Sequence, residues 1–239
     1  MPVTHHVVAP PEEATKSQVL QLVVDNLTDI SAIGITPSNP LYNLYQYGIG
    51  FEVHLYLEAM KANGELRVEL LIATDLDDPQ TVTGFALYLP VQGDPDACTL
   101  AYIAVDQDYR RQGIARALVQ QMTARYPHAE LTCAVSKVAC FEALGFRVIG
   151  LRGPQVLMNT RDHASDGQVA MLDVAPIYRT LEVRQIHTYL LQQHGKRAMV
   201  DAEKQRDRHL DQLQRKTEAF VLERLDPAAL QPGTRVHLV

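Results

Sequence analysis

The chain has 239 residues, of which 46% are hydrophobic and 21% charged, a composition typical of folded proteins and unlike that of disordered ones. Its formal net charge is −6, so we expect no nucleic-acid partner, because phosphates are bound by clustered Lys and Arg. Three cysteines occur without a CxxC pair, which argues against a disulfide framework or a cysteine-based zinc site and favours a reducing compartment.

The N-terminal sequence and the hydropathy pattern predict a cytoplasmic protein. Residues 1–14 lack the basic segment and apolar core of a secretory signal. No apolar stretch approaches the ~18 residues that a membrane span needs, so we expect no membrane partner. The pair His5 and His6 stands in a proline-bearing segment without further ligands nearby, and we predict no metal site.

Two helices are predicted in the first quarter of the chain. Residues 1–13 contain three prolines and are expected to be an extended lead-in. Apolar residues recur at helical spacing from Ala14, and a second helix is predicted over residues 51–64, where Asn63-Gly64 would end it. The tyrosine-rich segment 41–50 is expected to belong to the connection between them.

After residue 64 the pattern becomes that of a sheet. Two β-rich runs at 66–75 and 81–91, joined by Asp and Pro, predict an antiparallel hairpin, and a third strand follows over 99–105. A helix, a strand, a short helix and a final hairpin are then predicted, over residues 110–126, 131–135, 136–144 and 146–158 in turn. This order predicts a layered, mixed α/β fold.

Residues 161–239 differ in character and are predicted to form a helical extension. Helical stretches are expected over 177–194 and 196–225, separated by Gly195. The second stretch carries apolar or small residues spaced three, four and three apart on one helix seam: Leu210, Leu213, Thr217 and Phe220. Two interpretations stay open: the seam packs on its own domain, or residues 177–225 dock to a second copy, as in a homo-oligomer, or to a larger assembly.

The segment between the third strand and the next helix holds the most informative chemistry. Gly113 opens a helix whose first backbone N–H groups have no partner within that helix, and Arg110 and Arg111 stand beside it. Such a helix start suits a pyrophosphate, and a glycine lets the anion approach the backbone closely. A routine connection with two solvated arginines is the alternative.

This segment resembles motif A of the GCN5-related N-acetyltransferases, the GNAT family, whose signature Arg/Gln-x-x-Gly-x-Gly/Ala is complete from Arg110 to Ala115. The run CFEALGF at 140–146 is similar to the family's motif B, commonly YEKLGF, and Gly84 stands where a family strand often carries glycine. The resemblance implies a GNAT fold over residues 14–160. That fold is a central, mixed and mostly antiparallel sheet flanked by helices, here followed by the C-terminal helical extension.

The resemblance also implies a reaction. Acetyl-CoA would be the co-substrate, without a metal, and acetyl would pass by direct attack in a ternary complex to a primary amine on a small molecule or a protein. Motif A would hold the pyrophosphate and the preceding strand the pantetheine arm, through Ile103, Val105, Arg110, Arg111, Gln112, Gly113, Ile114 and Ala115. The acceptor would approach past the turn at Arg152 and past three tyrosines, which are candidate substrate-binding residues or part of the core: Tyr42, Tyr45 and Tyr47.

The sequence departs from the family where protons are transferred. Phe141 stands where many members carry a tyrosine acid, and the strand lacks the carboxylate often found near Ala101 or Tyr102. Candidate catalytic residues are therefore Tyr102 and Cys140, and His54 or Glu52 could reach the cleft from the second helix. The alternative function is a catalytically weak GNAT-fold binding or structural module whose C-terminal helices mediate assembly.

Overall fold

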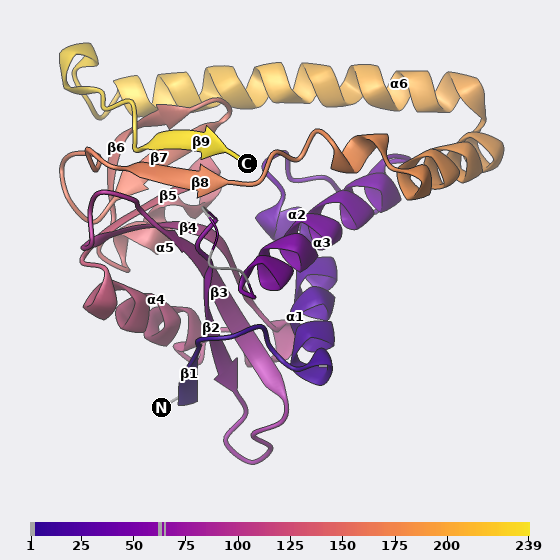
Figure 1. The fold of residues 1–239 in the computed structure, drawn as a ribbon. Coiled ribbons are helices and arrows are strands. Elements are labelled where there is room, and N and C mark those ends of the chain that lie inside the picture. The colour runs from indigo at the N-terminus through magenta and orange to yellow at the C-terminus, as the bar shows by residue number, and fades with distance from the viewer. Residues whose placement is uncertain (1–2, 62–63, 65) are drawn as a thin grey trace.

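The computed structural model describes residues 3–61, 64 and 66–239 (Figure 1). Within these residues seven strands form one sheet in the order β1-β2-β3-β4-β5-β7-β6. Neighbouring strands are antiparallel except β4 and β5, which are parallel. The strands are β1 (Val3–Val7), β2 (Glu69–Thr74), β3 (Val82–Pro90), β4 (Ala97–Val105), β5 (His128–Cys133), β6 (Arg147–Arg152) and β7 (Gln155–Asn159). The mixed, mostly antiparallel sheet that the sequence predicts is confirmed.

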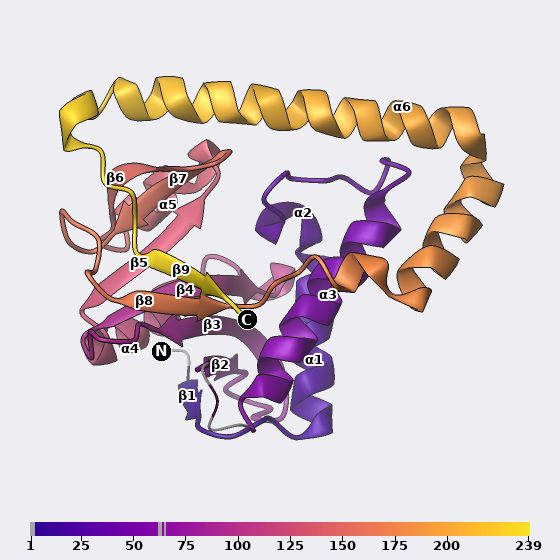
Figure 2. The same ribbon diagram turned by 45° about the horizontal axis from the view of Figure 1, so that its top comes forward.

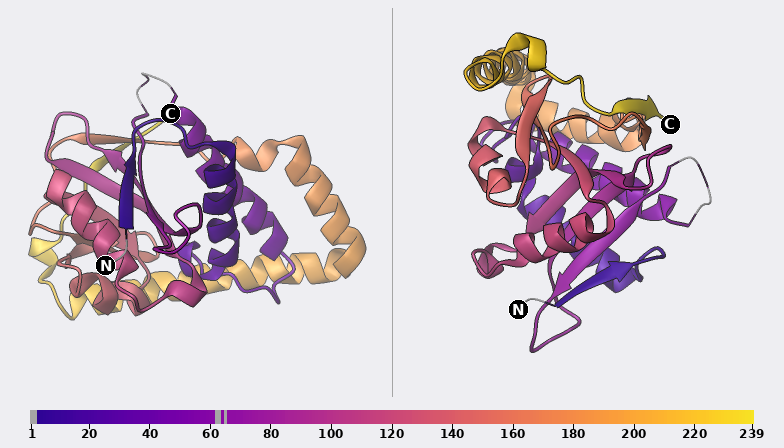
Figure 3. Two further views of the ribbon diagram at one scale, coloured as in Figure 1. Left: turned by 90° about the horizontal axis from the view of Figure 1, so that it is seen from below. Right: turned by 90° about the vertical axis from the view of Figure 1, so that its left-hand side faces the viewer.

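Helices cover both faces of this sheet (Figure 3). α1 (Glu13–Asp25), α2 (Leu27–Ile30) and α3 (Tyr42–Ala59) lie on one side, and α4 (Ile114–Arg125) and α5 (Val138–Glu142) on the other. Short 3₁₀ helices lie in the connections: η1 (Gln107–Tyr109), η2 (Val135–Lys137), η3 (Ile177–Arg179) and η4 (Pro227–Ala229). Because β3 and β4 are covered on both faces, their buried side chains alternate between two separate apolar cores.

The sheet opens between β4 and β5. Only Ala97–Leu100 of β4 pair with β5, so residues 102–105 of β4 are paired with β3 alone. The pairing with β3 shifts register next to Tyr102, which leaves Ala101 as an extra residue in β4. The two parallel strands therefore separate toward their C-terminal ends.

The open edge of β4 presents backbone groups. The N–H of Asp106 donates to the Thr83 carbonyl of β3 at 2.9 Å. Because backbone groups of successive strand residues point to opposite edges, Val105 and Ile103 direct their N–H and C=O groups toward the opening.

The C-terminal extension contains strands as well as helix. α6 (Leu181–Leu222) is interrupted at Gly195, whose φ of 79° and ψ of 156° are not helical. Figure 2 shows the longer arm of α6 spanning the molecule and the shorter arm turning toward α3. β8 (Gln168–Met171) and β9 (Arg235–Leu238) form a separate parallel pair. The long C-terminal helix is as expected, whereas the sequence analysis predicted neither strand.

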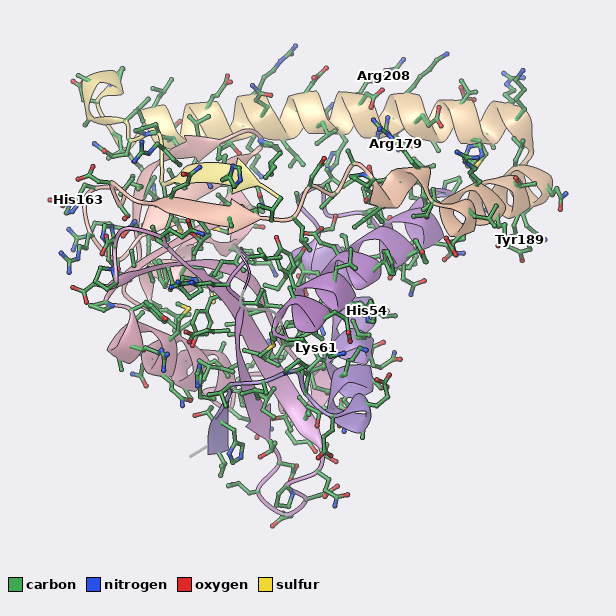
Figure 4. All side chains as sticks on the ribbon, in the orientation of Figure 1. His54, Lys61, His163, Arg179, Tyr189 and Arg208 are labelled. Carbon is green, nitrogen blue, oxygen red and sulfur yellow. The ribbon has the colours of Figure 1, made fainter. Side chains whose placement is uncertain are left out.

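The seam of α6 faces its own domain. Leu210 and Leu213 pack in a cluster with residues of the loop before α3, and the buried hydroxyl of Thr217 donates to the Pro154 carbonyl at 2.8 Å. Figure 4 shows Arg208 pointing away from the body of the molecule. The structure thus shows the first of the two interpretations, and docking through residues 177–225 stays a prediction.

The extension is also tied to the sheet through a buried carboxylate. Glu130 of β5 is 1% exposed, and its Oε2 accepts hydrogen bonds from the backbone N–H and the hydroxyl of Thr234, both at 3.0 Å. Arg152 donates to Glu130 at 3.2 Å and to the Thr234 carbonyl at 2.9 Å. These bonds hold the segment that leads into β9 against the core.

The tyrosine-rich segment is helical, which differs from the expected loop. α3 begins at Tyr42. In the turn that precedes it, the Asn39 side chain accepts a hydrogen bond from the Leu41 N–H at 2.8 Å. Leu41 is buried in a cluster with Leu190 and Met199 of α6, a contact that stabilises this end of the helix and is not visible in the local sequence. α3 ends at Ala59, and the expected helix end at Asn63 lies outside the described residues.

Candidate active site

A cleft of about 310 Å³, here the α5 cleft, lies where β4 and β5 separate on the side of α5. Its floor is residues 101–105 of β4, and residues 132–134 after the split of β5 form one wall. Lys137, Cys140 and Phe141 close the side toward α5. Arg110 and Ala115 of the expected motif A line its end, so the structure brings this loop and the open strand edge together.

The loop before α4 has the backbone geometry of an anion site. Arg111 adopts a φ of 65° and Gly113 a φ of 82°, the left-handed region in which non-glycine residues are uncommon. The N–H groups of Ile114 and Ala115 begin α4 and have no acceptor within the helix. A Cβ placed on Gly113 would meet no atom within 4 Å, so open space lies beside this glycine at the start of the helix.

One carboxylate of the α5 cleft bonds to two cationic side chains that also line it. Asp29 of α2 accepts a hydrogen bond from Arg110 at 3.0 Å and another from Lys137, and Asn26 also accepts from Arg110. Burial would raise the pKa of Asp29, but the bonds from Lys137 and Arg110 outweigh burial and hold that pKa below its ordinary value. Arg110 is thus positioned by α1 and α2, whereas Arg111 is exposed.

A second cleft, here the α3 cleft, lies on the side of α3 and has a volume of about 610 Å³. The two clefts share lining residues at the strand split, among them Ala101, Tyr102, Thr132 and Gln155. They therefore meet at the point where β4 and β5 part. Three lining residues come from the C-terminal extension: Met171, Tyr178 and Val236.

A buried acid lies in the α3 cleft next to this junction. Burial raises the pKa of the Glu52 carboxyl from 4.5 to about 7, although a hydrogen bond from Tyr102 acts in the opposite direction. Burial and the charge of Glu52 raise the pKa of Tyr102 well above its ordinary value, so its hydroxyl stays protonated and donates to Glu52. Glu52 can accept and release a proton near neutral pH, which is the property of a general base.

The other predicted residues are placed differently. Tyr45 lines the α3 cleft, whereas Tyr42 and Tyr47 line neither cleft, and Tyr47 stacks on Phe51 with ring centroids 5.5 Å apart. Cys140 is exposed in the α5 cleft, which does not include Glu52. His54 lines neither cleft. The functional roles assigned to all these residues, and to Ile103, Val105 and the six residues from Arg110 to Ala115, stay predictions.

Sequence reasoning missed part of the site. Thr99, Lys137 and the three residues of the extension carry no local signal that marks them as cleft residues, because chain segments distant in sequence bring them together. In the described part of the chain, no three His, Cys, Asp or Glu side chains gather as metal ligands would. Among the same residues, no helix has the length and apolar character of a membrane span.

Comparison with known proteins finds one family match and similar solved structures. Residues 41–146 match the model of the acetyltransferase (GNAT) family, which confirms the resemblance seen in motifs A and B. The structure is similar to that of PaiA N-acetyltransferase from Thermoplasma acidophilum in complex with coenzyme A, with 11% identity over 66% of this chain and 99% of that one and a TM-score of 0.51. This likeness shows a shared fold. No curated protein matches the chain.

Two further solved structures have lower TM-scores. Aminoglycoside 6'-acetyltransferase type Ii is 17% identical over 66% of this chain and 95% of its own, with a TM-score of 0.48. Nourseothricin acetyltransferase is 19% identical over 38% of this chain, with a TM-score of 0.34. The match spans 64% of the length of the latter protein.

Proposed function

We propose that the protein is an acetyl-CoA-dependent N-acetyltransferase acting on a primary amine, on the premise that residues 41–146 match the model of the acetyltransferase (GNAT) family. One observation carries the proposal. A carboxyl group with a pKa of about 7, Glu52, lies beside the junction of two clefts, one of which leads to an anion-binding helix start. A donor and an acceptor entering from opposite sides would meet there.

The α5 cleft fits the donor. The unpaired N–H groups at the start of α4, with the open space over Gly113, suit a pyrophosphate. The open edge of β4 at Ile103 and Val105 offers backbone groups to the amides of a pantetheine arm. Acetyl-CoA supplies the reactive thioester carbonyl. The register shift at Ala101 places unpaired backbone at the junction, where an N–H group could polarise that carbonyl.

Glu52 would remove a proton from the ammonium group of the acceptor. A primary alkylamine is largely protonated at neutral pH, as a lysine side chain is, and cannot attack until it loses a proton. Glu52 accepts that proton, the amine nitrogen bonds to the acetyl carbon, and the carbon–sulfur bond breaks. The nitrogen loses a second proton as the amide forms, and this proton passes to the departing thiolate to give coenzyme A. Tyr102 is a positioning residue, because its hydrogen bond orients the Glu52 carboxylate.

Donor binding is tested by calorimetry with acetyl-CoA. The wild-type protein is expected to bind in the micromolar range, and the variant Arg110→Ala/Gly113→Asp is expected to lose binding, because an aspartate places a side chain and a negative charge where the anion would lie. Gly93→Asp is the matched control, since Gly93 has a similar φ of 84° and lies in the turn between β3 and β4. It should bind as the wild type does.

The opposite result has a definite meaning. A folded wild-type protein that carries no copurified coenzyme A and binds no acetyl-CoA would refute the enzyme proposal. The alternative, a GNAT-fold structural or binding module, would then replace it, and Phe141 in the α5 cleft, where a hydroxyl acid is absent, favours that alternative.

Tyr102→Phe is expected to shift the pH dependence of the reaction. The Tyr102 hydrogen bond lowers the pKa of Glu52, so its removal should raise that pKa further, and the rise of kcat/KM with pH should move to higher pH. The pH profile of kcat/KM checks this. An unchanged profile in a folded variant would exclude the positioning role.

A further inference from the structure

Most polar side chains of the α3 cleft already have protein partners. The Thr132 hydroxyl donates to Gln155 at 3.0 Å, and Arg152 is paired with the buried Glu130 at 3.2 Å. The Tyr45 hydroxyl is hydrogen-bonded by Arg206 of α6. These groups are satisfied without a ligand, and the charge of Arg152 is balanced within the protein.

One polar group of the α3 cleft lacks such a partner. The Thr99 hydroxyl has no hydrogen-bond partner among the described residues, in a side chain that is 5% exposed. It lines the same cleft as Tyr102 and Glu52. A buried hydroxyl without a partner is costly unless water or a ligand satisfies it. The cleft thus holds one buried hydroxyl that lacks a protein partner, and among the described residues Glu52 is the only carboxylate that lines it.

The other walls are apolar or aromatic, and the C-terminal extension supplies part of them. Apart from Tyr45, Tyr178 and the partnered polar groups, they are formed mainly by Ile30, Ile33, Ile49, Met171 and Val236. Tyr178 packs directly on Gly48 of α3, because a Cβ on Gly48 would lie 2.6 Å from the Tyr178 hydroxyl. The glycine thus provides the space that lets this tyrosine lie against α3 as a wall of the cleft.

We propose that the acceptor is a compact primary monoamine with an apolar or aromatic body, and that Tyr178 of the C-terminal extension determines this preference. The inference rests on the proposed function, because it describes the acceptor side of the same reaction. One carboxylate matches one ammonium group. A polycation would place further charges against apolar walls without a partner, which is unfavourable. A lysine within a peptide carries polar backbone groups that apolar walls would leave without partners.

The experiment measures release of coenzyme A from acetyl-CoA with 2-phenylethylamine, spermidine, an aminoglycoside and a lysine-containing peptide as acceptors. We expect kcat/KM for 2-phenylethylamine to exceed the others at least tenfold. Tyr178→Ala should raise KM for this amine roughly tenfold, the size of one well-packed aromatic contact with its buried area. Tyr178→Phe, which keeps the ring, should stay close to the wild type.

A pair of glycines on α3 provides the control. Gly48→Ala should raise KM as Tyr178→Ala does, because the methyl group displaces the tyrosine, whereas Gly50→Ala meets no atom within 4 Å and should have no effect. The Kd for acetyl-CoA, from calorimetry, should be unchanged in all four variants.

The outcomes distinguish a failure of this inference from a failure of the proposed acetyltransferase function. A wild-type enzyme that binds acetyl-CoA but prefers spermidine, the aminoglycoside or the peptide overturns the inference and leaves the acetyltransferase standing. An unchanged KM in both Tyr178→Ala and Gly48→Ala also overturns it. Loss of acetyl-CoA binding in the wild type refutes the proposed function instead.

Discussion

Glu52→Gln is expected to lower kcat by about 10²- to 10⁴-fold, the usual contribution of a general base. The glutamine keeps the size and the hydrogen bond from Tyr102 but cannot accept a proton. In the wild type, kcat/KM should rise with pH and level off above pH 7, because the Glu52 carboxyl has a pKa of about 7 and accepts a proton only when ionised. This rise of kcat/KM with pH should be absent in Glu52→Gln. Steady-state kinetics from pH 5.5 to 9 measure both effects.

The same substitution should stabilise the fold above neutral pH. The folded-state pKa of Glu52 is raised from 4.5 to about 7, so the wild-type protein loses stability as the pH rises through this interval and the buried carboxyl ionises. Glutamine carries no such penalty. Thermal melts should therefore show a higher Tm for Glu52→Gln than for the wild type above pH 7, with a smaller advantage near pH 4.5.

The control for this pair of measurements is His54→Gln on the same helix. His54 lines neither cleft, so its replacement should leave the pH profile of the reaction unchanged. Should His54→Gln abolish the rise of kcat/KM near pH 7 while Glu52→Gln retains it, the assignment of the base to Glu52 would be wrong.

Glu130→Ala is expected to lower the free energy of unfolding by about 2 to 4 kcal/mol, because it leaves a buried N–H without an acceptor and an arginine without its counterion. The N–H belongs to Thr234 and the arginine is Arg152, which is 33% exposed and so partly screened by solvent. Equilibrium unfolding in urea measures the change. The segment before β9 should also become susceptible to proteolysis, since Glu130 holds it.

Two further variants identify the cause. Gly150→Ala keeps every charge but places a Cβ 2.5 Å from the Gln231 carbonyl, so it should loosen the same segment by steric conflict. Glu142→Ala removes another Glu–Arg pair between the extension and the domain, 2.7 Å from Arg224, but both side chains are exposed. Its cost should stay below about 1 kcal/mol. A loss in Glu130→Ala no larger than in Glu142→Ala would contradict the buried role of Glu130.

The features that could be predicted from sequence depend on local patterns. The β2–β3 hairpin and the strand at β4 follow from β-rich runs with turn residues between them, and Arg110 to Ala115 follow from a six-residue motif. A left-handed Gly113 before a helix is encoded by the residues around it. For these elements the sequence is sufficient, because few distant contacts are needed to form them.

The features that sequence reasoning missed depend on contacts between distant segments. Tyr42 starts a helix because Leu41 packs against α6, more than a hundred residues later. Glu52 was one of two candidates on its helix, and only its burial beside Tyr102 separates it from His54. The strands β8 and β9 are four residues each, so neither has a pattern long enough to detect. Tyr178 is a cleft residue only because Gly48 leaves it space.

The pairing of β8 with β9 affects the order in which the protein can fold during translation. The N–H of Val239 bonds to the Met171 carbonyl and that of Asp173 to the Val239 carbonyl, both at 2.9 Å, so one wall of the α3 cleft joins segments made more than sixty residues apart. The central sheet and the anion loop can form while the remaining chain is still being translated. The acceptor pocket cannot be finished until Val236 has emerged. In a nascent chain the α5 cleft, lined by residues up to 155, would thus form before the α3 cleft, which needs Val236.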